Sequence, residues 1–271
     1  MKHGAYLNTN AASSASDLVD LGVAAEEGGW DGIFVSDSLL FGYPEPWTVL
    51  ASIAARTEQV RLGTWISPVA LQQPWRLAHA VATVDQLSGG RVVLGAGLGT
   101  RQEFEMFGDP YNPRTLRHRY DEALEIIVGL WGDEPFSFSG EHFQLREARL
   151  GVRPIQRPRV PIIIAAWWPN TRAFRRAATW DGIMPYWPAL LGGGVGPEGQ
   201  QPTGATVQDE LRELLDFYRS LDPSPDSEIV LPRERPSRSY TELCEALGAT
   251  WLLTTYPLDA DELRKGPGLP H

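Results

Sequence analysis

Short apolar runs alternate with amphipathic stretches along the whole chain, and this alternation predicts an α/β fold. The apolar runs are rich in β-branched residues and continuously apolar, as in parallel strands buried on both faces. We predict eight such strands, at residues 3–7, 32–36, 60–66, 91–95, 161–166, 182–186, 228–231 and 250–255. Amphipathic stretches predict eight helices between and after them, at residues 16–28, 47–57, 75–87, 116–131, 171–179, 206–220, 239–247 and 259–265.

Eight strands, each followed by a helix, predict a TIM-type (β/α)8 barrel formed as one domain by residues 1–271. The competing fold is a doubly wound open sheet, which usually carries a glycine-rich turn after its first strand. Here the first strand leads into Asn-Thr-Asn-Ala-Ala at residues 8–12, which contains no glycine. The barrel is therefore the favoured fold.

Two segments interrupt the alternation. Residues 132–160 contain the sequence FSFSGEHFQL, which predicts a β-hairpin inserted before the fifth strand. Residues 187–205 are too rich in glycine and proline for regular structure, so they predict a loop at the catalytic face. A mobile lid and a plain surface loop are equal alternatives for this segment.

Charge and cysteine content narrow the class of protein. The net charge is −10, and a basic surface that could grip nucleic acid or an anionic membrane is missing. Cys244 is the single cysteine, so an intrachain disulfide cannot form. Residues 1–10 lack the apolar stretch of a signal peptide, and the chain lacks an apolar run long enough for a membrane span. We expect a cytoplasmic protein with neither nucleic-acid nor membrane partners.

The predicted strand ends hold few groups for acid–base chemistry. Active sites of such barrels form where strands end and the following loops begin. Asp37, followed by Ser38, is the one carboxylate at a strand end. Metal-ligand spacings and a Gly-x-Ser-x-Gly elbow are both missing, so we predict no metal site and disfavour hydrolysis by a triad or a metal.

Aromatic side chains are abundant at the same strand ends. A mouth lined with such rings suits a flat, conjugated ligand that stacks and excludes water. For any single tryptophan, capping of the barrel core is the favoured interpretation, but five aromatic residues at one rim favour a ligand. The five aromatic residues are Trp65, Trp167, Trp168, Tyr186 and Trp187.

The glycine-rich stretch at residues 95–99 is similar to a nucleotide-binding loop without matching one. Thr100 stands where the dinucleotide fingerprint needs its last glycine. Unhindered backbone amides followed by Thr100 and Arg101 can bind a phosphate, and a tight strand-to-helix turn is the alternative.

Nearly the whole chain resembles the luciferase-like monooxygenases, a family of flavin- and deazaflavin-dependent oxidoreductases. Among the stretches that carry the resemblance are residues 24–40 (AAEEGGWDGIFVSDSLL), 46–68 (PWTVLASIAARTEQVRLGTWISP), 76–99 (RLAHAVATVDQLSGGRVVLGAGLG), 153–170 (RPIQRPRVPIIIAAWWPN) and 175–185 (RRAATWDGIMP). The resemblance implies FMN, or alternatively coenzyme F420, at the mouth of the barrel. It also implies a cis peptide bond between Trp65 and Ile66, and phosphate contacts after the fifth strand.

Position and resemblance together give the expected site. The expected catalytic residues are Asp37 and Ser38. The expected cofactor-binding residues are Thr64, Trp65, Ile66, Gly97, Gly99, Thr100, Arg101, Ala165, Ala166, Trp167, Trp168 and Asn170. The expected partners are a small-molecule substrate, a flavin reductase and further copies of the chain in a homo-oligomer.

Two departures from the family pattern leave the function open. Asp37-Ser38 stands where the family carries Asp-His, and Trp167-Trp168 stands where many members carry Gly-Gly. The leading interpretation is a flavin- or deazaflavin-dependent oxidoreductase or monooxygenase. A non-catalytic flavin-binding relative is the alternative. A cofactor-free lyase or hydrolase is disfavoured, because the rim lacks two convergent acid–base groups.

Overall fold

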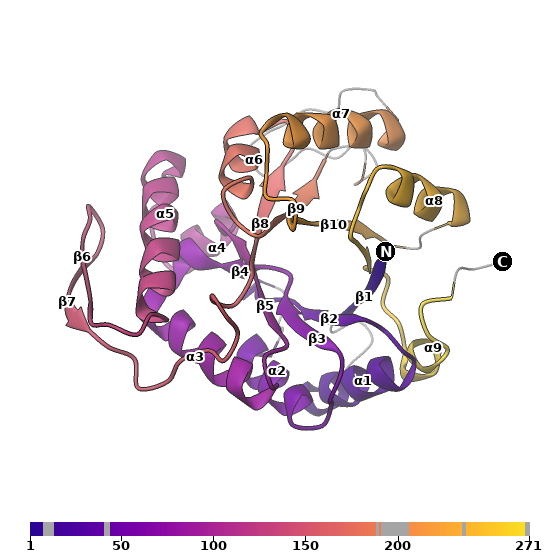
Figure 1. Ribbon diagram of the computed structural model, residues 1–271, viewed down its shortest axis with the longest axis horizontal. Helices are drawn as coiled ribbons and strands as arrows, with labels where there is room; N and C mark the ends of the chain where they lie inside the picture. Colours follow the sequence, from indigo (N-terminus) through magenta and orange to yellow (C-terminus); the bar gives the residue numbers. More distant parts are fainter. Residues whose placement is uncertain (8–13, 41–43, 188–189, 191–205, 235–236, 269–271) are drawn as a thin grey trace.

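Eight parallel strands close into a barrel surrounded by helices, which confirms the predicted fold (Figure 1). The computed structural model describes residues 1–7, 14–40, 44–187, 190, 206–234 and 237–268. The barrel strands are β1 (Lys2–Leu7), β2 (Gly32–Val35), β3 (Arg61–Thr64), β5 (Val92–Gly97), β8 (Ile162–Trp167), β9 (Gly182–Tyr186), β10 (Glu228–Arg233) and β11 (Trp251–Thr254). Pairing of β1 with β11 and of β3 with β5 closes the ring.

Helices lie at every predicted position, with ends that differ by a few residues. They are α1 (Ala15–Glu27), α2 (Pro46–Ala54), α3 (Pro74–Leu87), α5 (Pro113–Leu130), α6 (Thr171–Ala177), α7 (Val207–Ser220), α8 (Arg238–Ala246) and α9 (Ala260–Arg264). The prediction missed the short helix α4 (Arg101–Met106), the 3-10 turn η1 (Val69–Leu71) and the two-residue strand β4 (Ser67–Pro68). All three lie in loops that follow β3 and β5, at the carboxyl ends of the strands.

The predicted hairpin insertion is confirmed. Strands β6 (Phe136–Ser139) and β7 (Gln144–Ala148) pair antiparallel and stand outside the barrel beside α5 (Figure 1). The carboxylate of Glu122 on α5 accepts hydrogen bonds from the backbone N–H groups of residues 141–143 at the hairpin turn. The loop predicted at residues 187–205 lies outside the described residues, except for Trp187 and Leu190.

Large side chains fill the interior of the barrel, and glycines on neighbouring strands make room for them. The buried interior cluster consists of Phe34, Val93, Ile163, Met184, Val230, Trp251 and Leu253. A Cβ atom on Gly32 would lie 2.8 Å from the Trp251 ring, and one on Gly63 would lie 2.7 Å from the side chain of Val93. Because real side chains do not approach so closely, these two positions need glycine. A second, larger cluster fills the space between strands and helices.

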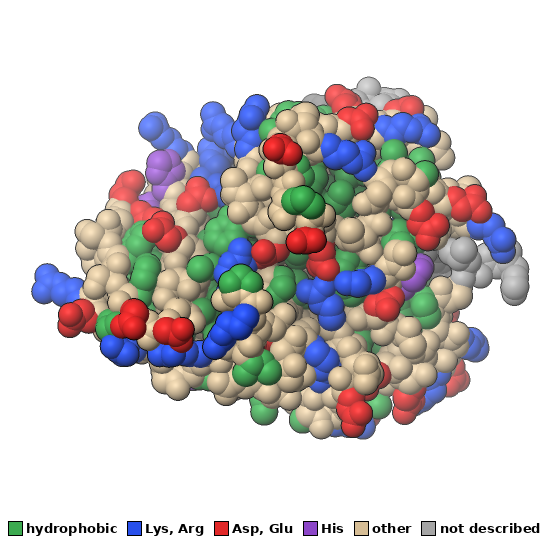
Figure 2. Space-filling view, viewed as in Figure 1, with side chains coloured by type: hydrophobic (Ala, Val, Ile, Leu, Met, Phe, Trp, Pro, Cys, Tyr) green, Lys and Arg blue, Asp and Glu red, His purple; other side chains and the backbone are tan. Residues whose placement is uncertain are grey.

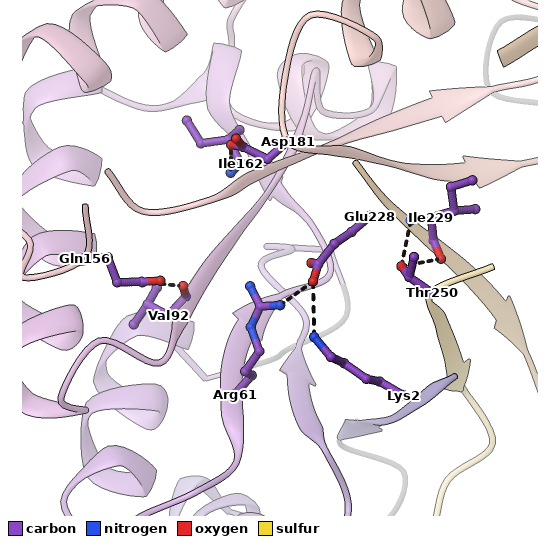
Figure 3. A network of polar contacts seen from close by, with 9 residues as sticks. All are labelled: Lys2, Arg61, Val92, Gln156, Ile162, Asp181, Glu228, Ile229 and Thr250. Carbon is purple, nitrogen blue, oxygen red and sulfur yellow. Dashed lines mark hydrogen bonds and ion pairs between the residues drawn. The ribbon is translucent and has the colours of Figure 1, made fainter. Parts of the chain in front are cut away.

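A charged network closes the barrel at the amino ends of the strands (Figure 3). Glu228 Oε1 lies 2.6 Å from Nη1 of Arg61 and 3.5 Å from Nζ of Lys2. Both cations also lie over the ring of Trp251, at 5.5 Å and 5.0 Å from its centre. Beside this network, Asp181 pairs with Arg159 and accepts a hydrogen bond from the N–H of Ile162. This end of the barrel is built for stability, as is usual in this fold.

None of the described helices combines the length and the apolar character that a membrane crossing requires.

Replacing Glu228 with glutamine tests the network at the amino ends of the strands. We expect the free energy of unfolding to fall by about 1–3 kcal/mol, because Arg61 and Lys2 lose their shared counter-charge in a half-buried place. Asp133→Asn is the matched control, since it removes an exposed pair with Arg153. The control should cost less than about 0.5 kcal/mol. Equal losses in urea denaturation of the two variants would contradict the assigned role of Glu228.

Candidate active site

A cavity of about 400 Å³ opens at the carboxyl ends of strands β2, β3, β5, β8 and β9. Side chains from α4, α5 and α6 form its outer walls. Most of the predicted site residues line it: Asp37, Ser38, Trp65, Ile66, Gly97, Gly99, Thr100, Ala165, Ala166, Trp167 and Asn170. Reasoning from strand ends therefore locates the cavity and the side chains that the strands themselves contribute.

Three predicted residues lie away from the cavity lining. Thr64 is fully buried, and its hydroxyl donates a hydrogen bond to the carbonyl of Gly95 at 3.1 Å. It thus helps to join β3 to β5. Arg101 lies on the exposed side of α4, where its guanidinium covers the ring of Tyr111 at 4.7 Å.

The third of these residues is Trp168. Trp187, another of the five aromatic residues predicted at the mouth, also lies away from the cavity lining. Trp168 is buried against Phe174 and Phe217 of the helical layer, with ring centres 5.2 and 5.6 Å away. Trp187 is fully buried and also does not line the cavity. The prediction of five aromatic residues at one mouth is wrong for these two. Successive residues of a strand point to opposite faces, so Trp167 and Tyr186 face the cavity while their neighbours face the helices.

The aromatic wall of the cavity consists of Trp65, Tyr186 and Trp167. Trp65 and Tyr186 lie nearly parallel, with centres 5.8 Å apart and an angle of 13° between their planes. Trp167 continues the series on the other side of Tyr186, at 6.1 Å and 5°. The peptide bond between Trp65 and Ile66 is cis, which confirms the expectation drawn from the resemblance.

The indole N–H groups of Trp65 and Trp167 are buried and have no hydrogen-bond partner among the described residues, and the same holds for Trp47, Trp187 and Trp251, which do not line the cavity. These donors therefore do not distinguish the cavity. The cavity fits a flat heteroaromatic ring because its wall is aromatic and its lining also carries polar side chains, among them Asp37, Ser38 and Thr100. The residues present therefore fit a flavin or deazaflavin ring.

Asp37 lies at one end of the cavity, directly after β2. Its Oδ2 accepts a hydrogen bond from the side-chain amide of Gln72 at 2.9 Å. Burial raises the pKa of this carboxyl from its ordinary value of 3.8 to about 6. Hydrogen bonds from Ser67 and Gln72 lower the pKa of Asp37, and the nearby carboxylates of Glu45 and Glu103 raise it. Asp37 can thus gain or lose a proton close to neutral pH.

Glu103 is a second carboxyl at the same end of the cavity, which the prediction missed. It is 3% exposed, and its Oε1 accepts a hydrogen bond from the hydroxyl of Ser38 at 2.9 Å. Its Oε2 accepts hydrogen bonds from the N–H and the hydroxyl of Thr100, both at 2.9 Å. Thr100 and Glu103 form a capping box at the start of α4. The Thr-x-x-Glu spacing after the fourth barrel strand is the signal that could have revealed both helix and carboxyl.

Arginines form the opposite end of the cavity, and the prediction missed them as well. Arg117 comes from α5, and Arg172 and Arg176 come from α6. Nη2 of Arg176 lies 3.0 Å from Oδ2 of Asp121, and its guanidinium covers the ring of Tyr120 at 4.9 Å. These contacts hold a positive charge at the cavity wall. Because the arginines come from helices, the inspection of strand ends could not find them.

The fold and the cavity define a (β/α)8-barrel protein with an aromatic-walled cavity at its mouth, lined also by carboxyls and arginines. A family model described as luciferase-like monooxygenase matches residues 1–189 of the chain. The protein belongs to this family.

Sequence and structure comparisons agree with this assignment. The chain is 36% identical over 159 residues to an F420-dependent glucose-6-phosphate dehydrogenase of Amycolatopsis mediterranei, an alignment that covers 55% of the chain and 47% of the relative. The chain spans about half the length of the curated relatives it matches.

Two solved structures show the same fold at low sequence identity. The monooxygenase RslO1 from Streptomyces bottropensis has a TM-score of 0.77 at 19% identity, over 98% of this chain and 96% of that one. The oxygenating constituent of 3,6-diketocamphane monooxygenase from Pseudomonas putida, in complex with FMN, has a TM-score of 0.68 at 19% identity. That match covers 88% of this chain and 67% of that one.

The raised pKa of Asp37 predicts how stability depends on pH. Between about pH 4 and pH 6 the folded protein holds a proton on Asp37 that the unfolded chain has lost, so stability decreases as the pH rises. Asp37→Asn removes this loss and keeps an acceptor for Gln72. We expect the unfolding free energy of the variant, minus that of the wild type, to increase by about 2–3 kcal/mol from pH 4 to pH 7. A difference in urea denaturation that stays constant across this range would refute the raised pKa.

Proposed function

We propose that the protein is a deazaflavin-dependent oxidoreductase, which uses coenzyme F420 to oxidise or reduce a small organic substrate at the mouth of the barrel. The observation that carries the proposal is the cavity itself, whose lining combines the aromatic wall of Trp65, Tyr186 and Trp167 with three arginines. The F420-dependent name of the curated relatives supports the choice of cofactor. FMN is the alternative, and it would need a flavin reductase as partner.

The arginine end favours the deazaflavin over FMN. Arg117, Arg172 and Arg176 converge on one end of a cavity in a protein whose net charge is −10. FMN carries one phosphate, which two guanidinium groups can satisfy. Coenzyme F420 carries a phosphodiester followed by an acidic tail, so it offers more negative charge to this end.

Each part of the cavity has a distinct role in this proposal. A bound deazaflavin supplies the hydride chemistry. Trp65 and Trp167 pack against the ring and exclude water from it. Gly97 keeps the space beside Ala165 and Ile66 open.

The carboxyl end moves the proton that accompanies the redox step. Asp37, ionised above about pH 6, takes the proton that an alcohol-type substrate loses on oxidation. Ser38 stands where the family carries histidine, and its hydroxyl is held by Glu103. Because this hydroxyl donates to Glu103 and also accepts from the N–H of Leu40 at 3.3 Å, it can only accept a hydrogen bond from a substrate, and Asp37 is the base.

The second candidate is a flavin-binding relative without catalysis, which the serine at position 38 favours. A protein of this kind would bind the cofactor and fail to exchange hydride with any small alcohol, aldehyde or ketone. Bound cofactor without turnover, across a panel of such substrates, would support this candidate over the oxidoreductase.

Titration of the purified protein with each cofactor tests the proposal. We expect coenzyme F420 to bind with a Kd in the micromolar range and at least about tenfold more tightly than FMN. A tenfold difference in Kd corresponds to about 1.4 kcal/mol of binding free energy. Fluorescence of the deazaflavin and isothermal titration calorimetry measure both values. Tighter binding of FMN would identify FMN, and not the deazaflavin, as the cofactor. Failure of both cofactors to bind would overturn the proposal.

Filling the cavity from β5 should weaken cofactor binding without unfolding the protein. A Cβ atom on Gly97 would meet protein atoms only at ordinary contact distances of 3.7 Å or more, so a side chain can start at this position of the cavity lining, and Gly97→Val extends it into ligand space. We expect cofactor affinity to fall by about tenfold or more. The Tm should stay within about 3 °C of the wild type. Gly151→Val, at a glycine with open space around it, is the control. Unchanged affinity in the Gly97 variant would place the cofactor elsewhere.

A further inference from the structure

Ser67 connects two polar side chains at the carboxyl end of the cavity. It lies in β4, which pairs with β5 through Ser67 and Ala96, and it is fully buried. Its Oγ lies 3.0 Å from Oγ1 of Thr64, and its side chain also hydrogen-bonds the carboxyl of Asp37. Ser67 therefore joins the proposed base to the wall of the barrel.

The hydroxyl of Ser67 has one hydrogen and two acceptors within reach. Thr64 donates its own hydroxyl hydrogen to the carbonyl of Gly95 at 3.1 Å, so its Oγ1 acts as an acceptor toward Ser67. The carboxyl of Asp37 is the other acceptor. Because a hydroxyl donates a single hydrogen bond, Ser67 serves one of these acceptors at a time.

The protonation of Asp37 decides between the two acceptors. An ionised carboxylate accepts a hydrogen bond about twice as strong as one between neutral groups, so it draws the hydrogen of Ser67 away from Thr64. A protonated carboxyl is a weaker acceptor, and the hydrogen then returns to Thr64. Gln72 holds the carboxyl in place in both states, since its side-chain amide donates to Oδ2 at 2.9 Å.

The charged groups that act on Asp37 are carboxylates. In the part of the chain that the structure describes, they are Glu45, at the start of α2, and Glu103 on α4, and both oppose its ionisation. Charged side chains of both signs are spread over the outer surface (Figure 2), where solvent and salt screen them. The ionised form of Asp37 therefore depends on its local donors, Ser67 and Gln72.

We propose that Ser67 is a positioning residue for Asp37, and that its hydroxyl hydrogen turns to Asp37 when the carboxyl is ionised and to Thr64 when the carboxyl holds a proton. The inference rests on the proposed function for the role of Asp37 as base, whereas the exchange of the hydrogen needs no cofactor. When Asp37 takes a proton from the substrate, the hydrogen of Ser67 swings to Thr64. The buried hydroxyl thus keeps an acceptor in both states, and neither state pays for an unmade hydrogen bond.

Substitutions on the two sides of this exchange should shift the pKa of Asp37 in opposite directions. Ser67→Ala removes a donor to the ionised form, so we expect it to raise the pKa of Asp37 from about 6 to about 7. Thr64→Val removes the acceptor that serves the protonated form, so it should lower the pKa of Asp37 to about 5. NMR of the full chain labelled with 13C-aspartate, recorded from pH 4 to pH 8, measures both values, and Asp37→Asn assigns the signal.

Matched controls exclude a general effect of losing a buried hydroxyl. Thr241 is 6% exposed and its hydroxyl also donates to a backbone carbonyl, that of Ser237, so Thr241→Val should leave the pKa of Asp37 at its wild-type value. Ser88→Ala is the corresponding control for serine, since its buried hydroxyl donates to a backbone carbonyl as well. Thr64→Ser keeps the acceptor and should behave as the wild type. Thr64→Ala gives the same test as Thr64→Val if the valine variant fails to fold.

The outcomes separate this inference from the proposed function. An unchanged pKa of Asp37 in Ser67→Ala, or shifts of the same sign in Ser67→Ala and Thr64→Val, would overturn the exchange. With coenzyme F420 and a substrate that turns over, the lower pH limit of kcat/KM should follow the pKa measured by NMR in each variant. A pH limit that stays fixed while the pKa moves would refute the positioning role. Opposite pKa shifts without turnover of any substrate would support the exchange and count against the proposed function.

Discussion

The parallel packing of Trp65 on Tyr186 is the interaction on which both the core and the candidate site depend. Below it, Trp65 contacts the interior cluster that includes Phe34 and Trp251, for which glycines on neighbouring strands make room. Above it, the same two rings form part of the cavity wall. The interior of the barrel is thus filled up to a flat aromatic layer, and the space beyond that layer remains available to a ligand.

Charge is distributed unequally around this aromatic layer. Asp37 and Glu103 lie at the end built by β2 and α4, and burial raises the pKa of Asp37 to about 6. Arg117, Arg172 and Arg176 lie at the end built by α5 and α6. A ligand with a neutral ring and an anionic tail matches this distribution in one orientation, with its ring on the aromatic wall and its tail toward α6. The carboxyl end is then left beside the ring for a substrate.

The sequence could predict whatever depends on chain order and strand ends. The alternation of apolar runs located all eight barrel strands, and the strand ends located Asp37, Trp65, Gly97 and Trp167 at the cavity. Because side chains alternate between the two faces of a strand, Thr64 and Trp168 point away from the cavity. Each is next to an aromatic residue that faces the cavity, Trp65 or Trp167, so this alternation could have predicted both orientations. Glu103 and the arginines reach the cavity from helices, so their positions depend on tertiary packing that strand ends do not encode.

NMR spectra of the tryptophan indole N–H groups test the central claim most directly, because Trp65 and Trp167 line the cavity and their signals respond to an aromatic ring bound against them. With 15N-labelled tryptophan, the signals of Trp65 and Trp167 are assigned through Trp65→Phe and Trp167→Phe. Addition of coenzyme F420 should shift these two signals strongly. It should leave the signal of Trp131 in place, since that indole already donates to the carbonyl of Ala78 at 2.9 Å. Binding that leaves the signals of Trp65 and Trp167 unmoved would contradict the assignment of the aromatic wall as the cofactor site.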